Sequence, residues 1–164
     1  MRKLTALAPL AAVLAFSAAP AMAEPALISV SLSPELQEKA EELGPREVQE
    51  QADRLAELVG RALARDGDLD GARIELVLTD LRPNRPTFQQ MADRPGLDGF
   101  RSQSIGGAAI EGQITTADGR TVPVRYDWFS HNLADVRGFT TWQDADRAYR
   151  RLAVNLAEGR YVSR

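Results

Sequence analysis

The chain has 164 residues, with 20 basic and 23 acidic side chains, one histidine and no cysteine. The net charge of −3 argues against a nucleic-acid-binding protein, which would carry a basic stripe, so we expect no nucleic acid partner. Without cysteine, this chain forms no disulfide and has neither a thiol nucleophile nor thiolate metal ligands.

Residues 1–23 have the pattern of an export signal. Arg2 and Lys3 precede an apolar run over residues 4–19, and Ala21-Met22-Ala23 is a small-x-small cleavage pattern. A membrane anchor is the alternative, but it needs about 20 apolar residues. We expect cleavage after Ala23, a periplasmic location and no membrane span afterwards. Residues 24–164 would then form one domain with 18 basic and 23 acidic residues, a net charge of −5.

The first half of the mature chain predicts a strand, two helices and a second strand. Apolar residues alternate over 28–32, which indicates a strand. Ser33-Pro34 is typical of a helix start and predicts a short helix to Leu43. Apolar spacings of three, four and seven predict a long helix over 45–65. The next strand is predicted over 72–81, with Leu76, Leu78 and Asp80 on one face.

The central signal is a long hairpin over residues 105–129. Asp118-Gly119 is a strong indication of a tight turn between two strands. Alternation on the two arms places Ile110 and Ile114 on one face and Val124 and Trp128 on one face.

A last helix is predicted to begin at Thr140 or Thr141. Thr140 and Gln143 have the spacing of a capping box. Trp142, Tyr149 and Leu156 form an apolar stripe that we expect to pack against the hairpin.

The expected order is therefore β-α-β-β-β-α. Helices with one apolar stripe need a sheet face to cover, so we predict an α+β fold. It would be a two-layer sandwich, with a mostly antiparallel sheet of about four strands and two long helices on one face. A parallel crossover between the first two strands is an open alternative, and the strand order is left open.

An aspartate cluster follows the long helix. Asp66, Asp68, Asp70 and Gly71 match the first, third, fifth and sixth positions of an EF-hand calcium loop, but Val77 stands where the bidentate Glu belongs. We interpret the cluster as a polar turn. A calcium-stabilised module is the alternative, and calcium is the one cofactor that the sequence suggests.

Two further groups keep an enzyme open as an alternative. His131 invites a comparison with hydrolases, although a triad requires hydrogen bonds between segments and no G-x-S-x-G motif is present. Carboxylates could also converge across the sheet for glycoside cleavage. The first group comprises His131, Ser130, Asp127 and Asp135, and the second Glu111, Asp127 and Asp80.

Residues 82–104 are the best candidate for a binding site. Long connections without regular structure are usually functional or disordered. This one carries four arginines and two aspartates, and such arginines with aromatic anchors suit carboxylates, glycans and protein partners. The candidate contact residues are Arg82, Asn84, Arg85, Phe88, Gln89, Arg94 and Arg101. Alternatively, the segment folds back on the sheet, buries Phe88 and Phe100, and pairs its arginines with surface carboxylates.

Several stretches support a family resemblance: TDLRPNRPTFQQ, RPGLDGF, IGGAAIEGQI and TTWQDADRAYRRLA. Together they resemble a family of small exported proteins of unknown function from Gram-negative bacteria. The resemblance implies an exported protein, and it carries over neither an activity nor catalytic residues.

The sequence thus favours a non-catalytic periplasmic binding module. Its partner would be an envelope protein or a glycan, bound through residues 82–104. The alternatives are a small envelope hydrolase that uses carboxylates or His131, and a calcium-stabilised envelope module.

Overall fold

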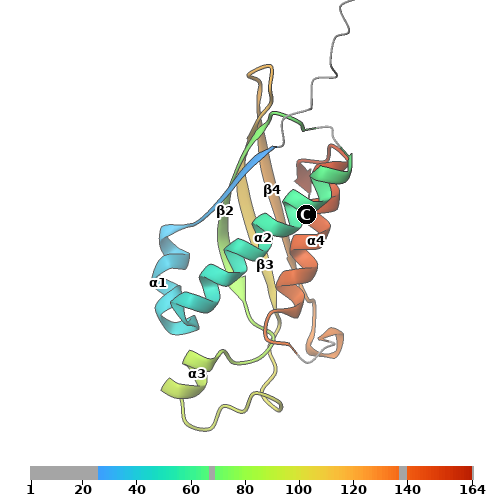
Figure 1. Ribbon diagram of the computed structural model, residues 1–164. Coiled ribbons are helices and arrows are strands. Elements are labelled where there is room, and N and C mark those ends of the chain that lie inside the picture. Colours follow the sequence, from blue (N-terminus) through green and yellow to red (C-terminus); the bar gives the residue numbers. More distant parts are fainter. Residues whose placement is uncertain (1–25, 67–68, 137–139, 164) are drawn as a thin grey trace, which may run out of the picture.

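A computed structural model describes residues 26–66, 69–136 and 140–163. One layer is a sheet, and the long helices α2 (Pro45–Asp66) and α4 (Gln143–Ala157) lie side by side over one of its faces (Figure 1). This arrangement confirms the α+β sandwich. The strands are β1 (Leu27–Leu32), β2 (Arg73–Arg82), β3 (Gly107–Thr115), β4 (Thr121–Phe129) and the two-residue β5 (Val162–Ser163). The predicted signal peptide lies outside the described residues.

The strand order is the order of the chain, β1-β2-β3-β4-β5. The central pairs β2–β3 and β3–β4 are antiparallel, and the two outer pairs β1–β2 and β4–β5 are parallel. The parallel alternative for the first two strands is therefore the observed one. The crossover from β1 to β2 passes through α1 (Pro34–Leu43) and α2.

The predicted hairpin is confirmed as β3 and β4. Gly119 has a φ of +83° in the turn, a conformation that glycine adopts without steric cost. In the register, Ile110 pairs with Tyr126 and Glu111 with Arg125. Side chains of α1, α2, α4 and the covered sheet face form the core, whose largest fully buried members include Leu55, Ile74, Leu76, Leu78, Ile110, Ile114, Tyr149 and Leu152.

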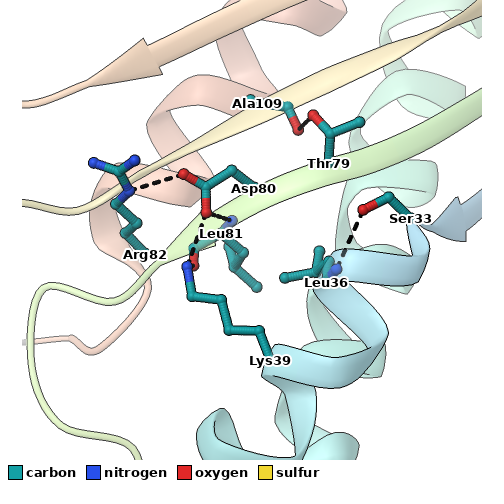
Figure 2. Close-up of polar contacts among 8 residues, drawn as sticks. All are labelled: Ser33, Leu36, Lys39, Thr79, Asp80, Leu81, Arg82 and Ala109. Atoms are coloured by element: carbon teal, nitrogen blue, oxygen red, sulfur yellow. Dashed lines mark hydrogen bonds and ion pairs between the residues drawn. The ribbon is translucent and has the colours of Figure 1, made fainter.

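A bulge in β2 overturns the predicted facing of Asp80. The pairing shifts between Leu78 and Asp80, so that Thr79 is an extra residue on this strand. Its hydroxyl donates to the Ala109 carbonyl over 3.1 Å. Beyond the bulge Leu81 is fully buried, and Asp80 is turned out of the core toward α1 (Figure 2).

The short helix α1 begins as predicted. The Ser33 hydroxyl accepts a hydrogen bond from the Leu36 amide over 3.2 Å (Figure 2), and Pro34 occupies the first turn. A capping hydrogen bond of this kind satisfies one of the backbone amides that have no partner within the helix at its N-terminus. The helix holds Leu36, Ala40 and Leu43 in the core.

The predicted capping box of the last helix is wrong. Helix α4 begins at Gln143, and the residue at its N-cap, Trp142, makes no capping hydrogen bond with its side chain. Trp142 is half-buried against the core, and its indole N–H donates to Glu47 of α2 over 3.1 Å. Trp142 is thus bonded to α2, although the sequence predicted that it packs against the hairpin.

We find no helix in the described part of the chain with the length and apolar character required to cross a membrane.

Candidate functional site

The connection between β2 and β3 extends beyond the end of the sheet (Figure 1). We call residues 82–104 the connecting segment. It was predicted to be irregular, yet it contains the short helix α3 (Phe88–Asp93). Thr87 and Gln90 form a complete capping box at its start. The segment therefore has a defined conformation at its first half.

Asn84 fixes the base of the segment to α4. Its side chain oxygen accepts the Asp144 amide over 2.8 Å, and its side chain nitrogen donates to the Asp144 carboxylate over 2.6 Å. Its backbone N–H donates to the Thr141 carbonyl over 2.7 Å. Asn84 is 2% exposed, which argues against the prediction that it contacts a partner. It supplies the cap that α4 lacks from its own sequence.

Asp144 is the centre of this buried polar cluster, and the sequence reading did not single it out. It is 1% exposed, and the Ser130 hydroxyl donates to the same oxygen as Asn84, over 2.5 Å. Its other oxygen lies 3.4 Å from Arg147. A Cβ on Gly106 would lie 2.6 Å from the Asn84 amide, so this position requires glycine.

Arg85 is also buried, at 6% exposure. Its guanidinium donates to the carbonyls of Gly99 and Phe100, on the far side of the segment. A buried guanidinium satisfied by backbone carbonyls holds the segment in shape. Its burial argues against the prediction that Arg85 contacts a partner.

Two phenylalanines of the segment face solvent. Phe88 is 80% exposed and Phe100 is 81% exposed. The alternative prediction that the segment buries both phenylalanines is therefore wrong. The other part of that alternative is observed, because Arg94 pairs with Glu42 of α1 and Arg82 pairs with Asp80.

The turn that carries Phe100 is fixed by Asp98. The Asp98 carboxylate accepts the backbone N–H groups of Arg101 and Phe100, each over 2.8 Å. These hydrogen bonds lower the pKa of Asp98 below its ordinary value of 3.8. The predicted contact residue Arg101 stands in the same turn, with an exposed side chain.

Glu47 of α2 holds two other segments at once. One carboxylate oxygen accepts the Phe88 backbone N–H over 3.0 Å, and the other accepts the Trp142 indole. Beside it lies a hollow of about 480 Å³, lined by Phe88, Gln89 and residues 44–47 and 50. The structure thus brings the predicted contact residues Phe88 and Gln89 together at one concave surface.

Arg82 and Arg94 line a different space. A cavity of about 360 Å³ lies between α1 and the connecting segment, and we call it the α1 cavity. Its lining residues are Lys39, Glu42, Leu43, Arg82, Pro83, Pro86, Gln90, Arg94, Leu97, Ser102, Gln103, Ser104 and Ile105.

Asp80 organises two of the cations at this cavity (Figure 2). Its carboxylate accepts hydrogen bonds from Lys39 and from Arg82, each over 2.8 Å. Burial acts to raise the pKa of Asp80, but the hydrogen bond from Lys39 and the charges of both cations outweigh it. The pKa of Asp80 is consequently lowered from its ordinary value of 3.8.

The remaining candidates do not gather with the segment. Ser130 donates to Asp144 and not to the exposed His131. Glu111 and Asp127 line a hollow on the uncovered sheet face, where Glu111 pairs with Arg125 over 3.0 Å, and Asp80 does not line it. The side chain of Asp135 lies outside the described residues. The hydrogen bond between Ser130 and His131 that the hydrolase alternative requires is therefore not formed.

The aspartate cluster is only partly described. Asp70 is exposed, whereas Asp68 and the side chain of Asp66 lie outside the described residues. Within residues 26–66, 69–136 and 140–163, no three His, Cys, Asp or Glu side chains gather as metal ligands. The calcium alternative stays a prediction.

No protein-family model matches the chain, and a search of curated proteins finds none similar to it. The resemblance to small exported proteins of Gram-negative bacteria therefore stays a prediction.

Proposed function

We propose that the protein is a non-catalytic binding module of the periplasm that contacts a partner protein through its connecting segment. The observation that carries this proposal is the exposure of Phe88 and Phe100 on a segment whose base is buried and hydrogen-bonded. Single apolar side chains on a surface are ordinary. Two aromatic side chains on one projecting segment are the residue type that dominates binding energy at protein interfaces.

The fixed conformation of the segment supports this reading. Asn84 and Arg85 hold it from within, and Thr87 and Asp98 cap its helix and its turn. A segment that is ordered before binding loses less conformational entropy when a partner docks. The 480 Å³ hollow beside Phe88 gives the partner a concave surface next to an aromatic anchor.

The charge of the segment favours an acidic surface on the partner. Arg101 is exposed near Phe100, and the side chain of Arg94 is 60% exposed beside Glu42. Rim charges of this kind steer association more than they set affinity. The periplasmic location rests on the export pattern of residues 1–23, and cleavage of that signal is tested separately below.

A photo-crosslinking amino acid placed at position 88 or 100 in living cells tests the proposal. We expect one discrete protein adduct from each position and none from position 133, where the exposed Leu133 serves as a control site. In a second assay, the crosslinking protein is added to an envelope extract. An excess of purified wild-type protein without the crosslinker should then reduce the amount of adduct. The Phe88→Ala/Phe100→Ala variant should not, whereas the matched Leu133→Ala/Val154→Ala variant should compete like wild type.

Both double variants change exposed side chains, so their melting temperatures should stay within a few degrees of wild type. Equal adducts from positions 88, 100 and 133, or full competition by the phenylalanine variant, would contradict the proposal. Protection of the segment by a glycan, without any protein adduct, would also contradict it.

A further inference from the structure

The α1 cavity and the hollow beside Phe88 share no lining residue. The cavity is therefore a separate feature of the molecule, and an inference from it does not rest on the proposed function. Its volume of about 360 Å³ lies within the range of small-molecule sites, about 300 to 1,000 Å³.

The charges at the cavity do not balance. Lys39, Arg82 and Arg94 line it together with one carboxylate, Glu42. Asp80, which does not itself line the cavity, pairs with both Lys39 and Arg82, while Glu42 pairs with Arg94. Two carboxylates thus serve three cations, and among residues 26–66, 69–136 and 140–163 no other carboxylate pairs with these cations.

These cations also keep hydrogen-bonding capacity. A lysine ammonium has three donors and a guanidinium has five. Lys39 donates to Asp80 and to the Leu81 carbonyl, and Arg94 reaches Glu42 with one terminal nitrogen. An additional anionic group can therefore be bound without displacing the existing pairs.

The rest of the wall is largely apolar. Leu43, Pro83, Pro86, Leu97 and Ile105 contribute aliphatic surface. Small-molecule sites combine walls of this kind with a few polar groups that fix the orientation of the ligand.

We propose that the α1 cavity binds a small molecule that carries one anionic group, a carboxylate or a phosphate, on a short apolar body. Lys39 and Arg94 hold the anionic group, and the aliphatic residues cover the apolar body.

Titration of the purified protein with hexanoate, followed by ¹H–¹⁵N NMR, tests this. We expect saturable shifts at the amides of Gln90, Leu97, Ser102 and Ile105. Acetate supplies only the anionic group and 1-hexanol only the apolar body. Each should bind at least about tenfold more weakly than hexanoate. The same titration with hexyl phosphate identifies the anionic group. Tighter binding of hexanoate assigns a carboxylate, tighter binding of hexyl phosphate assigns a phosphate, and both outcomes support the proposal.

Two variants and two controls locate the site. Arg94→Gln should weaken hexanoate binding about tenfold, and Leu97→Trp should block it by filling the cavity. Arg101→Gln removes a charge from the same segment outside the cavity and should leave binding unchanged. Phe88→Ala/Phe100→Ala should also leave it unchanged, which separates this site from the proposed protein contact.

The proposal is overturned if hexanoate gives no saturable shifts, or if 1-hexanol binds as tightly as hexanoate. Equal weakening of hexanoate binding by Arg94→Gln and Arg101→Gln would overturn it as well, because the weakening would then reflect the net charge of the protein and not a contact in the cavity. Unchanged binding in Leu97→Trp, with an otherwise native spectrum, would place the ligand elsewhere.

Discussion

Tyr149 is fully buried in the core, and its hydroxyl has no hydrogen-bond partner within the described residues. Burial raises the pKa of this hydroxyl far above its ordinary value. A polar group that is buried without a partner opposes folding, because it gives up its hydrogen bonds to water. The ring of Tyr149 therefore stabilises the fold while its hydroxyl weakens it.

We predict that Tyr149→Phe leaves the free energy of unfolding unchanged or raises it by about 1 kcal/mol. Tyr149→Ala should lower it by about 3 to 5 kcal/mol, because it leaves a cavity in the core. Urea unfolding of both variants measures the difference. A large loss in Tyr149→Phe would show that the hydroxyl is hydrogen-bonded in solution.

Asp80 gives the protein a stability that depends on pH. The pKa of Asp80 is lower in the folded protein than in the unfolded chain. Its contribution to the free energy of unfolding is therefore fully present above the pKa of the unfolded chain, about 3.9. This contribution is lost as the pH falls through the pKa of the folded protein. The carboxylate is partly exposed, so we expect Asp80→Asn to cost only about 1 kcal/mol at pH 7.

The cost of Asp80→Asn should shrink below about pH 4. Urea unfolding at pH 7 and at about pH 2.5 measures it, and Asp70→Asn, which changes an exposed carboxyl, is the control. If the difference between wild type and Asp80→Asn is the same at both pH values, the ion pairs do not supply the stability.

At the scale of elements, helix α4 depends on a residue that is distant in the sequence. Asn84 lies 60 positions before Asp144 and bonds both its amide and its carboxylate. We predict that Asn84→Ala lowers the free energy of unfolding by about 2 to 4 kcal/mol, from the lost cap and the buried carboxylate that loses a donor. Urea unfolding measures the loss, and hydrogen exchange should accelerate at the Asp144 amide.

As a control, Gln103→Ala changes an exposed amide of the same segment and should leave the free energy of unfolding nearly unchanged. A similar loss in both variants would contradict the capping role.

Two similar patterns show how far the sequence predicts the elements. Thr87 and Gln90 form a capping box, although the sequence reading assigned no helix there. Thr140 and Gln143 have the same spacing and were predicted to form one, but α4 is capped by Asn84. The spacing alone does not distinguish the two sites, because the second outcome depends on a contact between distant segments.

The same reasoning explains why the hairpin could be predicted from the sequence, whereas the burial of Asn84 and Arg85 could not. The turn at Asp118-Gly119 is local, so its residues suffice to predict it. The burial of Asn84 and Arg85 depends on Asp144, Gly99 and Phe100, whose positions follow only from the fold. Residue type alone suggested that both face a partner.

At the scale of the whole molecule, we predict that the exported protein begins at Glu24. Residues 1–23 have the sequence pattern expected of a signal peptide, with a basic start, an apolar run and a small-x-small end. Intact-mass measurement on protein from a periplasmic extract tests this, with Ala21→Leu/Ala23→Leu as a variant in which cleavage should fail. A mature protein that retains residues 1–23 would contradict the prediction.

The two ends of the connecting segment are tied together at its base. The Ser104 amide donates to the Asn84 carbonyl over 2.9 Å, and the Ser104 hydroxyl donates to the Pro83 carbonyl. The chain between these positions is thus a closed loop whose ends are set by the sheet, and loop-closure entropy grows only slowly with length. Insertions or grafted peptides at the exposed Pro95-Gly96, which leave the carbonyls bound by Arg85 in place, therefore need not disturb the sheet. This position can present new recognition sequences on an unchanged scaffold.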